Sequence, residues 1–301
     1  MKNPFLKSVI MLNVLLFMAA AACAHTAPQA GIKGQQFHPQ GDTIEVMSRA
    51  MDRIIKNVVI VPERYYDADL QQERYPVLYL LHGAAGDYSD WATRANLDSL
   101  STMYGIVIVC PDGQDSWYFD SPVDPKMQFE TYVSKELVEY IDSHYRTHAN
   151  RYMRAITGLS MGGHGALFLA FRHPDVFWSC GSMSGCMNIS KFPDRWHIKD
   201  RLGDYESNMQ RWDEHAVCNL IGQVKASTLE PAQNIIIDDG TKDIFYAHNM
   251  AMHEMLLEAG IDHDFTIRPG RHSWDYWVNS LDYHMLFFHK AFLRGAKLMN
   301  E

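Results

Sequence analysis

Short runs of β-branched residues alternate with longer segments of helical periodicity along most of this chain. The strand-like runs lie at residues 54–61, 77–81, 106–110, 155–158, 234–238 and 264–268, and glycine, proline or aspartate stands at or just after the end of each. The helix-like segments lie at residues 129–145, 161–172, 247–259 and 274–293. This alternation predicts the α/β class, with a mostly parallel central sheet and helices on both faces.

Length and composition allow one large packed domain. The chain has 301 residues, of which 47% are hydrophobic and 21% charged, a balance that excludes disordered and fibrous proteins. No repeat or low-complexity linker divides it, so we predict an N-terminal extension over residues 25–44 and a single domain over residues 45–301. The formal net charge of -9 argues against nucleic acid as a partner.

The first residues have the order of a secretory signal. Lys2 and Lys7 precede an apolar run at 9–22, and small residues follow, which predicts a signal peptide over residues 1–24. The apolar run is shorter than the ~20 residues of a membrane span, so we predict no stable span and a periplasmic or extracellular protein. A second interpretation makes Cys23 the lipid-bearing cysteine of a protein anchored at the cell surface.

The most informative motif is the G-x-S-x-G pattern at residues 158–163, GLSMGG. It ends a predicted strand and opens a predicted helix, which is the strand–turn–helix setting of a nucleophile elbow. Glycines on either side of Ser160 leave room for the sharp turn, and the serine would point out at the carboxyl edge of the sheet. The alternative is an ordinary glycine-rich turn.

A serine hydroxyl is a weak nucleophile and needs a base that an acid orients. Asp243 and His272 follow the last two predicted strands, in the order Ser, Asp, His that this setting requires. The carboxyl ends of parallel strands meet at one edge, so His272 would accept the Ser160 proton while Asp243 holds the imidazole. Asp238 and Asp239 are competing acids nearer the strand end, and we interpret them as turn or cap residues.

A tetrahedral intermediate also needs hydrogen-bond donors for its oxyanion. Residues 82–86, HGAAG, follow a predicted strand, where hydrolases with such an elbow present a backbone N–H. We predict the Ala84 N–H as one donor, with Ala85 as the alternative. The Met161 N–H, at the start of the elbow helix, would be the second donor.

Aromatic residues cluster in the loops of the predicted catalytic edge. We predict substrate contacts for Trp117 and Trp274, which could stack on a sugar or a phenolic ring. Packing of the loops against one another is the alternative, and it is favoured for Tyr118 and Trp277.

The sequence predicts neither a metal nor a cofactor. It contains no CxxC pair, HExxH or EF-hand loop, and His248 and His253 do not have the spacing of a helical metal pair. The serine, histidine and aspartate with the backbone donors supply the whole reaction. Removal of the signal would leave four cysteines, Cys110, Cys180, Cys186 and Cys218. An oxidising compartment permits disulfides among them, and the sequence does not decide between the three possible pairings.

Five segments occur in an order that resembles an esterase family. They are LHGAAG, PDG followed by SWY, GLSMGGHGAL, DDGTKDIF and RHSWDYW, and the resemblance runs from residue 45 to 297. The family includes feruloyl and acetylxylan esterases, S-formylglutathione hydrolases and mycobacterial mycolyltransferases. The resemblance implies an α/β-hydrolase fold without a large lid, and a triad of Ser160, Asp243 and His272. Leu159, where the formylglutathione enzymes usually have histidine, favours the secreted feruloyl esterase branch.

These observations together predict a secreted serine carboxylic-ester hydrolase that works through an acyl-enzyme. Its substrate would be an acylated carbohydrate or a small phenolic ester, with feruloyl or acetyl groups released from plant polysaccharide. Two alternatives remain, an acyltransferase of the same family and a non-catalytic carbohydrate-binding protein on this scaffold.

Overall fold

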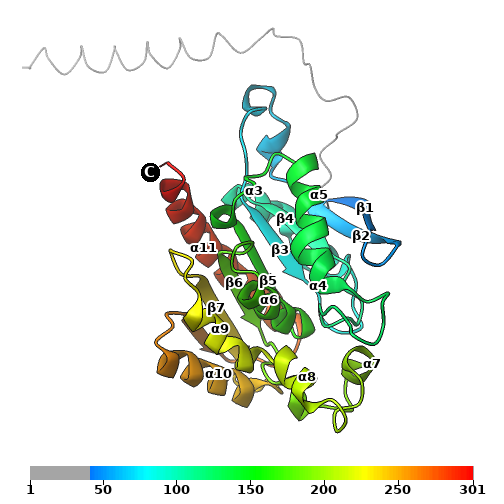
Figure 1. Ribbon diagram of the computed structural model, residues 1–301. Helices are drawn as coiled ribbons and strands as arrows, with labels where there is room; N and C mark the ends of the chain where they lie inside the picture. The colour runs from blue at the N-terminus through cyan, green and yellow to red at the C-terminus, as the bar shows by residue number, and fades with distance from the viewer. Residues whose placement is uncertain (1–40, 301) are drawn as a thin grey trace, which may run out of the picture. The chain divides into compact units, whose positions relative to one another are not determined.

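Eight strands form one sheet in the order β1-β2-β4-β3-β5-β6-β7-β8 (Figure 1). The computed structural model describes residues 41–300, so the predicted signal peptide, most of the extension and Cys23 lie outside the described residues. β1 pairs antiparallel with β2, and β2 antiparallel with β4, while every other pairing is parallel. The strands are β1 (Asp42–Ser48), β2 (Arg53–Ile60), β3 (Val77–Leu81), β4 (Val107–Pro111), β5 (Arg154–Gly158), β6 (Ser179–Met183), β7 (Asn234–Gly240) and β8 (Asp264–Arg268).

Two of these strands differ from the sequence-based expectation. β1 starts at Asp42, inside the stretch predicted as an extension, and it lies at the edge of the sheet against β2 alone. β6 has the sequence SCGSM, without a β-branched residue, so no strand was expected there. It is buried between β5 and β7, because tertiary context overrides weak local propensity.

The four predicted helical segments are all present. They appear as α6 (Met161–Arg172), α10 (Tyr246–Ala259), α11 (Trp274–Leu298) and a segment made of α4 (Phe129–Thr131), the π-turn η3 (Tyr132–Glu136) and α5 (Leu137–His144). Five short helices were not predicted: α2 (Asp90–Arg94), α3 (Leu97–Tyr104), α7 (Ile198–Leu202), α8 (Met209–His215) and α9 (Ile221–Ala226). Short 3₁₀ turns complete the set: η1 (Glu63–Tyr66), η2 (Ala68–Leu70), η4 (Arg151–Met153), η5 (Ile189–Lys191) and η6 (Val217–Leu220).

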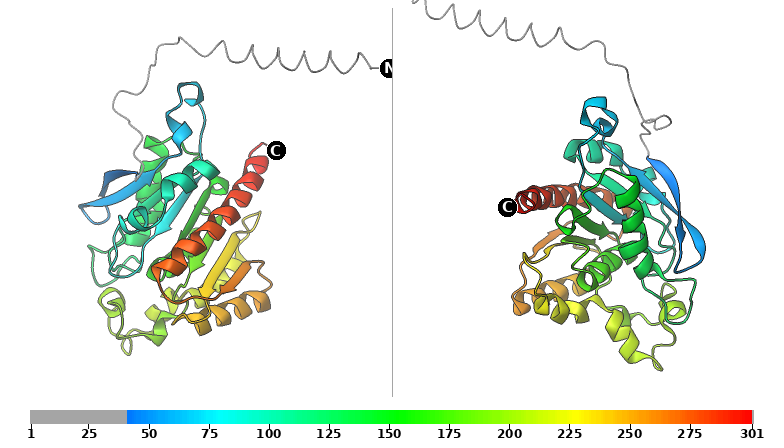
Figure 2. Two further views of the ribbon diagram at one scale, coloured as in Figure 1. Left: turned by 180° about the vertical axis from the view of Figure 1, so that it is seen from behind. Right: turned by 45° about the horizontal axis from the view of Figure 1, so that its top comes forward.

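Helices cover both faces of the sheet and bury the residues of its central strands β3, β4, β5 and β6. α3 and α11 lie on one face, and α5, α6 and α10 lie on the other (Figures 1 and 2). On β3, Leu78 and Leu80 belong to the core under α11, while Val77, Tyr79 and Leu81 belong to the core under α6. Each such side chain stabilises the fold by about 1.5–3 kcal/mol, so the sheet is a rigid base for the loops at its edge.

Each of the four cysteines in the described part of the chain is buried and unpaired. The longest helix within residues 41–300 is α11, with 25 residues. No helix within residues 41–300 combines the length and the apolar composition that a membrane span requires.

Candidate active site

The turn between β5 and α6 forces Ser160 into a strained backbone conformation. Its φ of 54° and ψ of -116° lie where non-glycine residues are rare, at a cost of about 1–3 kcal/mol. The turn is tight because a Cβ on Gly158 would lie 2.6 Å from the Leu81 carbonyl oxygen, and a Cβ on Gly162 would lie 2.5 Å from that of His82. The elbow thus depends on glycine on both sides.

Ser160, His272 and Asp243 form a continuous hydrogen-bonded chain at the carboxyl edge of the sheet. His272 Nε2 lies 2.9 Å from Ser160 Oγ, and Nδ1 lies 3.0 and 2.9 Å from the two carboxylate oxygens of Asp243. Because the carboxylate can only accept, Nδ1–H donates to it, which leaves Nε2 to accept the serine proton. The three residues predicted from the sequence are therefore brought together in the arrangement that activates a serine.

Neighbouring groups fix the acid and the imidazole. The Asp243 side chain is fully buried, and its Oδ1 also accepts the Phe245 backbone N–H at 2.8 Å. The His272 ring stands nearly perpendicular to the rings of Phe245 and Trp277, with centroids 5.3 and 4.8 Å away. These contacts hold the imidazole plane, so little reorganisation is needed when its charge changes.

The two competing acids do not contact His272. Asp238 faces α11, where it pairs with Arg268 at 2.6 Å and accepts hydrogen bonds from Tyr276 and Ser280. Asp239 points to the opposite face of the sheet, since successive strand residues alternate. The choice of Asp243 over its neighbours agrees with this geometry.

Two backbone N–H groups flank the serine. Met161 is the first residue of α6, so its N–H has no partner within the helix. Ala84 lies in the turn after β3, next to Gly83, whose added Cβ would be 3.5 Å from the Ser160 Cβ. The Ala85 N–H instead donates to Asp115 Oδ1 at 2.7 Å, while among the described residues no bond engages the Ala84 N–H. This supports Ala84 rather than Ala85 as the donor that acts together with Met161.

His82 holds the turn that carries Ala84, a role that the sequence reasoning missed. Its Nε2 accepts the Gly113 backbone N–H at 2.8 Å, so Nδ1 carries the proton and donates to the Gly83 carbonyl at 2.7 Å. The Tyr118 hydroxyl donates to the His82 carbonyl at 3.2 Å. The two loops after β3 and β4 are thereby tied together beside the serine.

The two predicted substrate-contacting tryptophans have different surroundings. Trp117 is 1% exposed, its indole N–H donates to the Trp196 carbonyl at 3.0 Å, and its ring packs on His164. The structure therefore gives Trp117 the packing role and leaves no ring face for a substrate. Trp274 is half-buried and lines a surface groove of about 570 Å³, with the Arg94 guanidinium 4.7 Å from its ring centroid. Only Trp274 of this pair keeps an accessible surface.

An aromatic cluster that was not predicted lies next to His272. The Trp196 ring is 5.5 Å from Phe245 and 5.3 Å from Phe192, and Phe245 in turn contacts His272. Trp196 comes from residues 184–233, the connection between β6 and β7, where positive φ angles at Trp196 and His197 turn the chain. No sequence period links these rings, since they meet only through the fold.

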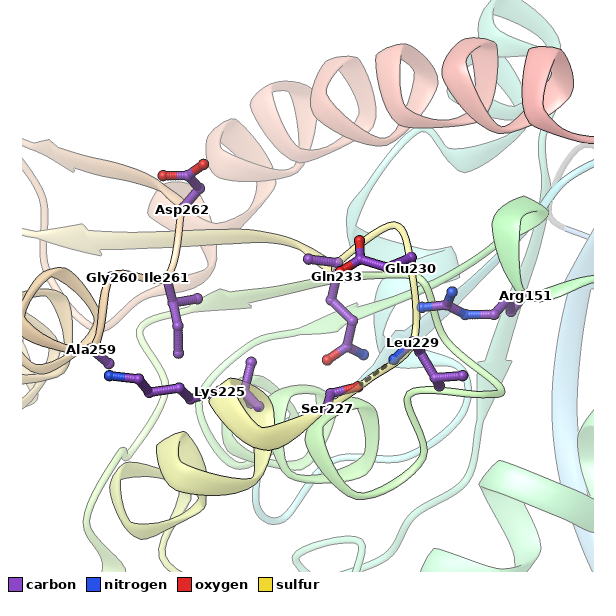
Figure 3. Close-up of a pocket in the computed structure, with 12 residues that line it drawn as sticks. Arg151, Lys225, Ser227, Leu229, Glu230, Gln233, Ala259, Gly260, Ile261 and Asp262 are labelled. Carbon is purple, nitrogen blue, oxygen red and sulfur yellow. Dashed lines mark hydrogen bonds between the residues drawn. The ribbon is translucent and has the colours of Figure 1, made fainter.

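A separate cavity of about 340 Å³ lies at the other end of the strands (Figure 3). Of the residues that line it, Gln233 immediately precedes β7 and Arg151 lies three residues before β5, whereas Ser160 follows the carboxyl end of β5. Lys225 and Arg151 balance Glu230 and Asp262 in charge. The cavity is therefore separate from the serine site, and its lining selects neither a positively nor a negatively charged ligand.

Comparison with known proteins agrees with this geometry. The Esterase family model matches residues 48–288, most of the described chain. The chain belongs to the Esterase family. An acetyl esterase from Caldicellulosiruptor saccharolyticus is 28% identical over 228 residues, which are 72% of this chain and 84% of that protein. As a member of this family, the chain is a serine ester hydrolase.

Solved structures of esterases share the fold. A ferulic acid esterase superposes with a TM-score of 0.70 at 25% identity, over 83% of this chain and 97% of that chain. An S-formylglutathione hydrolase from Staphylococcus aureus also gives a TM-score of 0.70, at 19% identity, over 82% of this chain and 98% of that chain. The predicted α/β-hydrolase fold is confirmed.

Metal ligands do not gather in the part of the chain that the structure describes. Within residues 41–300, no three His, Cys, Asp or Glu side chains lie together in a way that could hold a metal ion. That the esterase works without a metal or cofactor remains a prediction, based on the hydrogen-bonded chain described above.

Proposed function

We propose that this esterase is exported and cleaves carboxylic esters with a catalytic triad of Ser160, His272 and Asp243. The observation that carries the proposal is the chain of contacts of about 2.9 Å from the serine hydroxyl through the imidazole to the buried carboxylate. A hydroxyl, a base and an orienting acid in this order make an alcohol nucleophilic at neutral pH.

The reaction proceeds in two halves. His272 Nε2 takes the Ser160 proton while Oγ attacks the ester carbonyl, and the N–H groups of Ala84 and Met161 stabilise the oxyanion. The imidazolium, stabilised by Asp243, then protonates the leaving alcohol and the acyl-enzyme remains. Water attacks this acyl group with His272 as base, and collapse of the second intermediate releases the acid and returns the proton to Ser160.

We infer that the acyl group is feruloyl, with acetyl as the alternative, and that the alcohol is a sugar of plant polysaccharide. The half-buried rings of Phe192 and Trp196, which pack against the buried Phe245 beside His272, support a planar phenolic acyl group. The groove at Trp274 supports a sugar, since an indole with nearby carboxylates suits carbohydrate. A ferulic acid esterase and an acetyl esterase are both among the similar proteins.

A pair of esters tests the acyl group. The chain without residues 1–24 should hydrolyse methyl ferulate, and Trp196→Ala should lower kcat/KM for this ester about fivefold, because a lost ring contact costs about 1 kcal/mol. The kcat/KM for 4-nitrophenyl acetate should change less than about twofold, since the only ring of this ester is in its leaving group and its acyl group has none. Cleavage of the acetate alone would point to a short acyl group or an acyl-transfer donor. If neither ester is cleaved, the binding-protein interpretation replaces this one.

Export is tested separately, because its signal lies outside the described residues. Lys2, Lys7 and the apolar run at 9–22 support cleavage after Ala24. N-terminal sequencing of the exported protein should then begin at His25. A lipid-modified Cys23 as first residue would show surface anchoring instead, and an intact Met1 in the cytoplasmic fraction would contradict export.

A further inference from the structure

Asp239, the penultimate residue of β7, is a buried carboxyl group that the proposed mechanism does not use. The residue is 0% exposed, and its Oδ1 accepts only the adjacent Gly240 backbone N–H at 2.8 Å. Its Oδ2 has no hydrogen-bond partner among the described residues. A buried carboxylate with one hydrogen-bond donor and no cation is unfavourable, so burial favours the protonated, neutral form of the group.

The two charged groups that raise the pKa of Asp239 are both carboxylates, Asp243 and Asp238. Asp243 follows four residues later, and its carboxylate accepts hydrogen bonds from His272 and from the Phe245 backbone. Asp238 points to the other face of the sheet, where it takes the one nearby cation, Arg268. Asp239 therefore faces a like charge without compensation.

The other elements packed around this end of β7 contribute no charge. The Ser184 hydroxyl, on the loop after β6, lies near enough to Asp239 to lower its pKa. Neither the Ser184 Oγ nor the Asp239 Oδ2 has a partner in hydrogen-bonding geometry among the described residues. Cys186 on the same loop is a neutral thiol, because burial raises its pKa. His164 of α6 is neutral, since burial lowers its pKa to about 4. From α10, Asn249 is uncharged, and burial lowers the pKa of the half-buried His248.

We propose that Asp239 is a positioning residue that holds a proton at neutral pH, so that Asp243 is the single charged carboxylate behind His272. The inference rests on the proposed triad. Burial raises the pKa of Asp239 to about 8, and the charge of Asp243 adds to this effect. When Asp239 ionises, two carboxylates repel each other in a site without a cation. Asp243 then loses its fixed position, and with it the hold on the imidazole.

The dependence of kcat on pH tests the positioning role. The wild type should lose activity about tenfold from pH 7 to pH 9 as this group ionises, while Asp239→Asn, a neutral isostere, should keep its rate over that range. Asp243→Asn serves as the matched control and should be about 10⁴-fold slower than the wild type. Alkaline limbs that coincide in the wild type and Asp239→Asn would overturn the proposal. So would a loss at pH 7 in Asp239→Asn as large as that in Asp243→Asn.

Thermal unfolding tests the bound proton without using activity. The pKa of Asp239 rises from 3.8 to about 8 on folding, so the unfolded chain releases this proton first and stability declines as pH rises through that window. Asp239→Asn should lack this part of the decline and should melt at a higher temperature than the wild type at pH 8. Equal slopes, or failure of Asp239→Asn to fold at pH 7, would contradict a protonated Asp239. Because this measurement does not depend on the triad, it separates a failure of this inference from a failure of the proposed mechanism.

Discussion

Ser160→Ala should reduce ester hydrolysis by about four to six orders of magnitude while the protein stays folded. The substitution removes the oxygen that would attack the ester and leaves His272 without the hydroxyl it contacts at 2.9 Å. Stability should change little, since alanine adopts the same strained conformation as serine at this turn. The measurement is kcat for 4-nitrophenyl acetate with the melting temperature of the same preparation.

Ser182→Ala is the matched control for this experiment. Ser182 is a fully buried serine near the elbow, and its hydroxyl has no hydrogen-bond partner in the described chain. The hydroxyl lies close to Gly163, whose added Cβ would approach it to 2.7 Å, but it has no contact with His272. We expect nearly full activity, because no bond is lost. Activity in Ser160→Ala equal to that of Ser182→Ala would exclude the serine mechanism.

The catalytic trio could be predicted because it depends on local signals and on topology. The GLSMGG segment places Ser160 between a strand and a helix, and the loops after two later parallel strands must end at the same edge. The chain order Ser, Asp, His then leaves few residues that could be the acid and the base. The same reasoning could not place Trp117, which is buried at a turn whose positive φ of 59° has no signature in the sequence.

Other parts of the fold depend on contacts between distant segments. β6, with the sequence SCGSM, forms a strand because β5 and β7 supply its hydrogen bonds. The sequence does not reveal His82 as a support for the oxyanion turn, because the N–H that donates to it belongs to Gly113, 31 residues later. The Trp196 cluster likewise joins the connection between β6 and β7 to the loop after β7. Pairwise contacts of this kind leave no periodic pattern for a sequence to reveal.

Gly162→Ala should destabilise the protein by about 3 kcal/mol, which corresponds to a fall of about 6–12 °C in melting temperature. The new Cβ would lie 2.5 Å from the carbonyl oxygen of His82 and 2.6 Å from that of Leu81. Both atoms are backbone, so no side chain can move aside. The elbow helix must shift away from β3, and the Met161 N–H then moves relative to the Ala84 N–H. Hydrolysis should therefore fall together with stability.

The comparison that isolates this effect is Gly222→Ala. Gly222 also lies near the start of a helix, α9, but a Cβ built there meets no atom within 4 Å. Alanine favours the helix over glycine by about 0.5–1 kcal/mol, so this substitution should raise stability slightly and leave activity unchanged. The same gain in helix propensity applies at Gly162. If Gly162→Ala lowers stability while Gly222→Ala raises it, the loss of stability at Gly162 comes from its close approach to the backbone at the end of β3. If Gly162→Ala is as stable as Gly222→Ala, the elbow has more room than this packing allows.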